Sequence, residues 1–95
     1  MPTSTKDTLK IVIKQKWFDE ILAKKKVTEY RAVIPYWQSR LYDKNNKKRH
    51  YDLIEFINGY QTDARRLVTG YEGFKKRGDE FLIGIGKIKK KINTL

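Results

Sequence analysis

Residues 16–31 read K-W-F-D-E-I-L-A-K-K-K-V-T-E-Y-R, and the periodicity of hydrophobic side chains changes once within this stretch. In its first half the large hydrophobic residues recur at the spacing of an α-helix, with charged residues between them: Trp17, Phe18, Ile21 and Leu22. From Val27 the period is two, which is typical of a β-strand. The stretch therefore predicts a helix over about 15–24, a basic turn at 23–26 and a strand over 27–34.

The predicted strand carries two opposite charges on one face. Glu29 and Arg31 lie between Val27 and Val33 on that face, about 6.5–7 Å apart along the strand. Lys26, just before the strand, reaches the same place. Two interpretations remain open. One is an ion pair at the rim of a barrel, which contributes about 0–1 kcal/mol when exposed; the other is a charged functional site.

The alternation of side chains predicts further short elements in the rest of the chain. These are strands over about 8–14, 51–57, 64–74 and 80–88, and one or two helical turns over 36–42. The pair Asn58-Gly59 indicates a hairpin, and Gly70 and Gly73 indicate bulges. Glycines at 84 and 86 would let another backbone or a ligand approach the last strand closely. Periodicity alone thus predicts a small α+β domain that is mainly β, or a barrel.

The first run also resembles a known family signature. The pattern Trp17-Phe18-x-x-Ile21-Leu22-Ala23-x-x-Lys26-x-x-Glu29-x-Arg31 resembles that of the ASCH domain family, whose fold is related to the PUA domain. The resemblance covers about residues 8–90 and extends to small members carried by phages and prophages. It continues at Tyr36-Trp37, at Phe56-x-Asn58-Gly59-Tyr60 and at Gly84-x-Gly86-Lys87-Ile88. The turn glycine of the family pattern is Lys24 in this chain.

The resemblance implies a small PUA-like β-barrel of about five to six strands with two short helices. The chain of 95 residues allows one such domain, 1–95. We expect residues 1–6 and 90–95 to be flexible, and the lysines at 89–91 to be partly disordered.

The charge of the chain is strongly one-sided. Lysine and arginine number 22 against 11 acidic residues, for a formal net charge of +11. Such an excess on a small domain favours a polyanionic partner, and the two Trp, six Tyr and four Phe provide surfaces for base stacking. No long basic amphipathic helix, membrane-spanning run or signal-peptide core is present, so we expect a cytoplasmic protein without a membrane partner.

Most catalytic motifs are absent from the sequence. There is no cysteine, no phosphate-binding glycine loop, and a single histidine, His50, so we expect neither a metal site nor a cofactor. Lys26 and Glu29 remain as catalytic candidates, because a desolvated lysine can act as a base or nucleophile beside a carboxylate. A second carboxylate would come from Glu55, Glu72 or Glu80.

Some members of the family are amidohydrolases that act on acylated cytidine nucleosides through a lysine, a threonine and a glutamate. Lys26 matches the lysine of that set. Glu29 stands at the position of the threonine, and Thr28 comes one residue earlier. The resemblance therefore leaves open whether this chain is an enzyme.

The leading hypothesis is an RNA-binding, or more generally nucleic-acid-binding, protein with a basic cleft around Lys26, Glu29 and Arg31. In this hypothesis Glu29 accepts hydrogen bonds from a base edge. The residues expected to bind the nucleic acid are Lys24, Lys25, Lys26, Arg31, Trp37 and Tyr60. Trp37 has a second interpretation, as a core residue. The alternatives are the amidohydrolase with Lys26 and Glu29 as catalytic residues, and a phage accessory protein that binds a host protein. Sequence preference and oligomeric state stay open.

Overall fold

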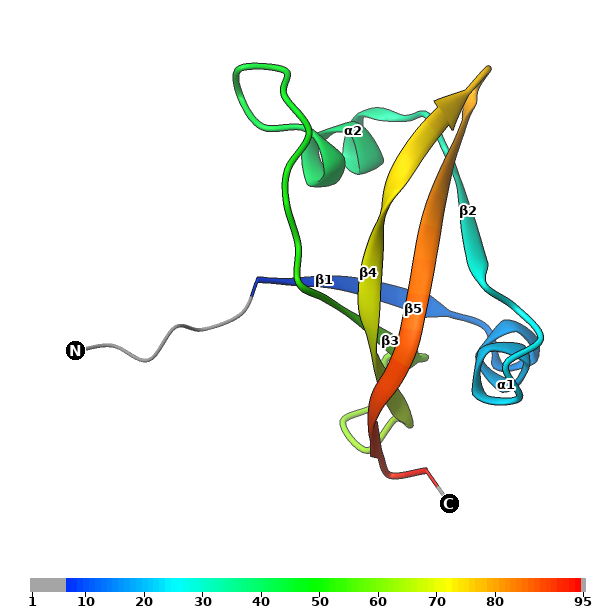
Figure 1. The fold of residues 1–95 in the computed structure, drawn as a ribbon. Helices are drawn as coiled ribbons and strands as arrows, with labels where there is room; N and C mark the ends of the chain where they lie inside the picture. Colours follow the sequence, from blue (N-terminus) through cyan, green and yellow to red (C-terminus); the bar gives the residue numbers. More distant parts are fainter. Residues whose placement is uncertain (1–6, 95) are drawn as a thin grey trace.

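The fold consists of one strongly curled sheet with two short helices (Figure 1). The computed structural model describes residues 7–94. Along the chain the elements are β1 (Thr8–Ile13), α1 (Gln15–Leu22), β2 (Thr28–Ala32), α2 (Pro35–Leu41), β3 (Leu53–Asn58), β4 (Arg66–Arg77) and β5 (Glu80–Ile92). The strand order is β1-β3-β4-β5-β2, with β1 parallel to β3 and the other pairs antiparallel. The predicted α+β class with a mainly β, barrel-like sheet is confirmed, and the sheet forms a half-barrel.

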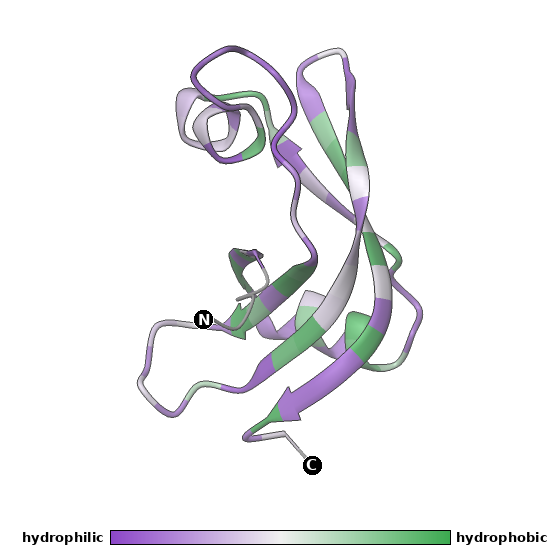
Figure 2. Ribbon diagram, turned by 60° about the vertical axis from the view of Figure 1, so that its left-hand side comes forward, coloured by the Kyte–Doolittle hydropathy of each residue, from purple (hydrophilic) through white to green (hydrophobic). Residues whose placement is uncertain are grey.

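The concave side of the sheet holds the hydrophobic core, and strand alternation determines which side chains enter it. In β1 the alternate residues Leu9, Ile11 and Ile13 are buried, as their spacing predicts. The alternate residues Phe81, Ile83 and Ile85 of β5 are buried in the same core. Figure 2 shows hydrophobic segments in the middle of the long strands and a hydrophilic stretch toward the end of β5.

The long hairpin of β4 and β5 gives the sheet its curl. Its register shifts three times between Val68 and Phe74, and Gly73 has a φ of +87°, so the predicted bulges are confirmed. A Cβ atom added at Gly84 would lie 2.7 Å from the Cβ of Glu72 on β4. The close approach predicted at this glycine therefore involves the neighbouring strand.

Several element boundaries differ from those predicted from the sequence. The helix α1 ends at Leu22, because Lys24 takes a left-handed φ of 63° and the N–H groups of Lys25 and Lys26 both donate to the Glu20 carbonyl. The last strand continues beyond Ile88 to Ile92, so residues 90–92 lie in a strand where we expected a flexible end. The expected flexibility of residues 1–6 lies outside the described residues.

The hairpin between β3 and β4 is confirmed, with a loop longer than the two residues its signal suggests. Asn58 ends β3, and its N–H donates to the Arg65 carbonyl at 2.9 Å. Only Gly59 of the pair has a positive φ, at +95°. The loop places Tyr60 beside the end of β1, which brings it to the site described next.

Candidate nucleic-acid interface

The two edge strands of the sheet, β1 and β2, are joined by a side chain. Arg31 of β2 donates from Nη2 to the Val12 carbonyl of β1 at 3.1 Å. Its Nε and Nη2 atoms also contact Glu29 Oε2, at 2.7 and 2.6 Å. Arg31 therefore closes the open side of the half-barrel, and Glu29 holds its guanidinium group in place.

Lys26 completes a cluster of three charges around the buried carboxylate of Glu29. Its Nζ lies 3.3 Å from Glu29 Oε1, so both carboxylate oxygens have a cationic partner. Glu29 is only 5% exposed. We call Lys26, Glu29 and Arg31 the Glu29 clasp. The structure brings together the three residues that the sequence placed in one site, and the clasp carries a formal charge of +1.

The helix α2 supports the clasp from one side. It starts at Pro35, a residue favoured in the first turn because it needs no hydrogen-bond donor there. The Arg31 guanidinium lies 5.0 Å from the centre of the Trp37 ring, within the range of a cation–π contact. Trp37 is 7% exposed, which agrees with its interpretation as a core residue and leaves little ring surface for a base.

A cleft of about 760 Å³ opens above the clasp. Its walls come from the end of β1, the start of α1, β2, α2 and the loop after β3. Three of its aromatic residues are well exposed: Trp17 at 40%, Tyr30 at 48% and Tyr60 at 90%. The ammonium groups of Lys16 and Lys26 lie 4.7 and 5.1 Å from the Trp17 ring. The cleft therefore presents flat rings beside cations, which can stack bases and contact phosphates.

The other lysines predicted for this site lie elsewhere. Lys24 and Lys25 are exposed but do not line the cleft, and Lys24 lines a separate hollow beside β5. Lys26 lines that hollow too, and its ammonium lies 5.2 Å from the ring of Tyr30, which lines the cleft. Of the predicted row of three lysines, Lys24 and Lys26 therefore line the hollow beside β5, and Lys25 lines neither feature.

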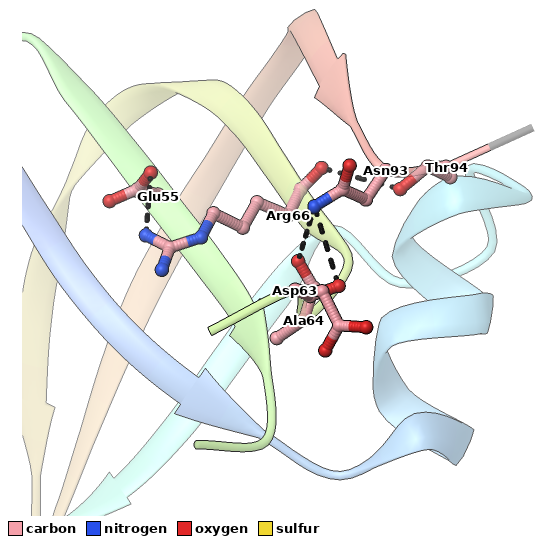
Figure 3. A network of polar contacts seen from close by, with 6 residues as sticks. All are labelled: Glu55, Asp63, Ala64, Arg66, Asn93 and Thr94. Carbon is pink, nitrogen blue, oxygen red and sulfur yellow. Dashed lines mark hydrogen bonds and ion pairs between the residues drawn. The ribbon is translucent and has the colours of Figure 1, made fainter. Parts of the chain in front are cut away.

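None of the three proposed second carboxylates pairs with Lys26 in the described part of the chain. Glu55 forms an ion pair with Arg66 at 3.3 Å, in a network that also joins the end of β5 to the loop before β4 (Figure 3). Glu72 packs against Gly84 on the neighbouring strand, and Glu80 begins β5 at the far end of the hairpin. Glu29 is the carboxylate that contacts Lys26.

The sequence reasoning missed two aromatic residues of the cleft. Trp17 belongs to the hydrophobic stripe predicted for the helix, and strand alternation puts Tyr30 on the face opposite Glu29. Both lie at the opening because α1 and β2 flank the unpaired edges of the sheet. The position of Lys16 next to Trp17 in the sequence was the signal that could have indicated a ring exposed beside a cation.

Two tyrosines outside the cleft have raised pKa values. Burial raises the pKa of Tyr71 to about 12, and burial also raises the pKa of Tyr51, against which Tyr71 packs edge-on. The Tyr51 hydroxyl donates to the Arg40 carbonyl, whereas the buried hydroxyl of Tyr71 has no hydrogen-bond partner among residues 7–94. Tyr51 belongs to the hydrophobic core, and Tyr71 packs against it.

The described residues contain no group of three or more metal-ligating side chains and no helix long and apolar enough to cross a membrane. Comparisons with protein-family models, with curated proteins and with solved structures found no match.

Proposed function

We propose that this chain binds RNA, with single-stranded nucleotides lying in the cleft above the Glu29 clasp. The observation that carries the proposal is the rim of this cleft, where Trp17, Tyr30 and Tyr60 are exposed beside cationic side chains. Exposed aromatic rings can stack on the unstacked bases of a single strand, whereas the bases of a duplex already stack on one another.

Charge supports the same proposal. The net charge of +11 attracts a polyanion at long range, Lys14 lines the cleft, and the Lys16 and Lys26 ammonium groups lie against the Trp17 ring at its rim. Two Arg31 nitrogens are held by Glu29 and Val12, which leaves its remaining Nη group to face a ligand. In this proposal the lysines and Arg31 contact phosphates while Trp17, Tyr30 and Tyr60 stack on bases.

The proposal is tested by titrating a fluorescently labelled single-stranded RNA with the protein between about 50 and 200 mM salt. We expect the logarithm of the binding constant to fall linearly with the logarithm of salt, with a slope of about −0.7 for each phosphate contacted. Trp17→Ala and Tyr60→Ala should weaken binding. Tyr36→Ala is the matched control, because Tyr36 is 52% exposed and lies outside the lining of the cleft. Absent binding, or affinity that ignores salt, would contradict the proposal.

The amidohydrolase alternative has one observation in its favour, the contact of Lys26 with Glu29 at 3.3 Å. Against it, Arg31 occupies the other carboxylate oxygen, so Glu29 would have to leave an ion pair before moving a proton. Incubating the protein with acylated cytidine and measuring free acid tests this alternative. Release that Lys26→Ala abolishes would establish it in place of simple binding.

We also propose, on the residues quoted from the sequence, that the chain is a divergent ASCH-type domain. The lysine at the glycine position of the turn fits this proposal, since Lys24 takes the left-handed φ of 63° that glycine adopts easily. Lys24→Gly should then preserve or raise stability, which thermal unfolding would show.

A further inference from the structure

The last strand of the sheet is longer than the strand beside it. Pairing between β2 and β5 runs from Ala32 with Glu80 to Thr28 with Gly84, and a final hydrogen bond joins Ile85 N–H to the Val27 carbonyl. β5 continues to Ile92 with β4 on one side. Within residues 7–94 no strand lies on its other side, where Figure 1 shows α1 set apart from β5.

A hollow of about 550 Å³ lies between this free part of β5 and the end of α1 with its turn. Its floor is aliphatic, and its rim carries ammonium groups. The floor consists of Ile21, Leu22, Val27, Ile85 and Ile88, and the rim of Lys24, Lys26, Lys87 and Lys91. Among residues 7–94 no acidic side chain lines this hollow, which we call the lysine groove.

The main chain of β5 runs along the lysine groove, and its pairing fixes the direction of its groups as far as Ile85. In an antiparallel strand the N–H and C=O of one residue point to the same side, and this side alternates along the chain. Ile85 points to the β2 side, since its N–H reaches Val27. The register with β4 shifts between Ile85 and Ile88 and again between Ile88 and Lys90, so Ile85 is the last residue whose direction this alternation fixes.

We propose that the lysine groove binds an extended acidic peptide with aliphatic side chains, which adds to β5 as a further strand in line with β2. The free strand edge pairs with the peptide main chain, the aliphatic floor receives alternate side chains, and the four lysines receive the carboxylates between them. This surface is separate from the aromatic cleft, and its proposal does not depend on RNA binding.

The same features discriminate against the other occupants. A second copy of this chain would place lysines opposite lysines. Like charges on paired strands are destabilising, so the lysines disfavour pairing of this edge with another copy. RNA could use the lysines but has no aliphatic groups for the floor, and no exposed aromatic ring lines the groove for stacking.

The test uses the full chain and a labelled seven-residue peptide that alternates glutamate with valine, with a lysine–valine peptide for comparison. We expect fluorescence anisotropy to show binding of the acidic peptide alone. The double variant Lys87→Glu with Lys91→Glu should weaken it about tenfold, the effect of two partly exposed charge pairs. The control Lys75→Glu with Lys76→Glu makes the same charge change near the other end of the hairpin. It should leave the affinity within about twofold.

Hydrogen exchange provides a second measurement that does not depend on the variants. Bound peptide should slow exchange of amides between residues 86 and 92, because a new strand would pair with that edge. The proposal is overturned by absent binding, by equal losses in both double variants, or by binding without amide protection. It is also overturned if the groove variant weakens RNA while the peptide fails to bind, since the groove would then belong to the nucleic-acid surface.

Discussion

Replacing Glu29 by glutamine removes the charge on which the Glu29 clasp depends while preserving the shape of the side chain. Glu29 contacts Lys26 at 3.3 Å and two Arg31 nitrogens at 2.7 and 2.6 Å. Removing one partner from a buried ion pair costs about 3–5 kcal/mol, because the remaining charges stay without compensation. The Lys26 and Arg31 side chains are 12% and 24% exposed, so water recovers part of this loss. We expect Glu29→Gln to lower the free energy of unfolding by about 2–3 kcal/mol.

Urea denaturation measures this loss, and the control is Asp79→Asn in the exposed turn between β4 and β5, which makes the same change in net charge. For a domain of this size the midpoint should fall by about 1–2 M in Glu29→Gln and stay near that of the wild type in the control. An ion pair exposed at a rim is worth about 0–1 kcal/mol, so a larger loss would show that this cluster stabilises the fold as a buried ion pair. A change in Glu29→Gln of less than about 0.5 kcal/mol would refute the reasoning.

The same variant separates support of the cleft from contact with RNA. Both oxygens of Glu29 already have partners, so we expect no direct contact with a base. Loss of its negative charge should make the salt dependence of RNA binding steeper and raise affinity at low salt, provided that titration is done where the variant remains folded. If folded Glu29→Gln loses RNA binding, Glu29 itself reads the nucleic acid, as the sequence analysis expected.

Three further predictions follow from other parts of the molecule. Tyr60→Ala should weaken RNA binding by about 1–3 kcal/mol in anisotropy titrations without lowering the melting temperature, because the side chain is 90% exposed. The unfolded chain loses the Tyr71 proton near pH 10 and the folded chain near pH 12. The contribution of Tyr71 to the free energy of unfolding should therefore be complete below pH 10. Between pH 10 and pH 12 the free energy of unfolding should fall by up to about 1.4 kcal/mol per pH unit. Denaturation of Tyr71→Phe across that range should show a shallower fall, and an equally steep one would contradict it. Gly84→Ala should destabilise by about 1–3 kcal/mol in urea denaturation, since its Cβ would lie 2.7 Å from Glu72; a neutral result would mean that the strands separate easily there.

Local patterns predicted most of the elements, because burial of alternate side chains depends only on residues two apart. Leu9, Ile11 and Ile13 illustrate this, as their spacing alone specifies the inner face of β1. The clasp was predictable for a related reason, since Lys26, Glu29 and Arg31 lie within one turn and strand. Their proximity needs no knowledge of the tertiary fold.

Contacts between strands that are distant in the sequence could not be predicted from such local patterns. The hydrogen bond from Arg31 to the Val12 carbonyl joins two edge strands that only the complete sheet brings together. The length of β5 was missed because its lysines resemble a solvated tail. Main-chain pairing of Lys90 and Lys91 with β4 determines the strand there, and it leaves the side chains in water.

The arrangement also reassigns roles within the candidate site. Sequence reasoning centred recognition on Lys26, Glu29 and Arg31 and added Tyr60 as a stacking residue. In the structure Glu29 pairs with both cations, and the Arg31 guanidinium lies against the Trp37 ring. A cluster held this firmly is better suited to closing the half-barrel than to adapting to a ligand. Under the proposed function, recognition would then depend on the exposed rim, where the Tyr60 side chain is 90% exposed. Stability and binding should therefore respond to different substitutions, which is why Glu29→Gln and Tyr60→Ala together test the assignment more strictly than either does alone.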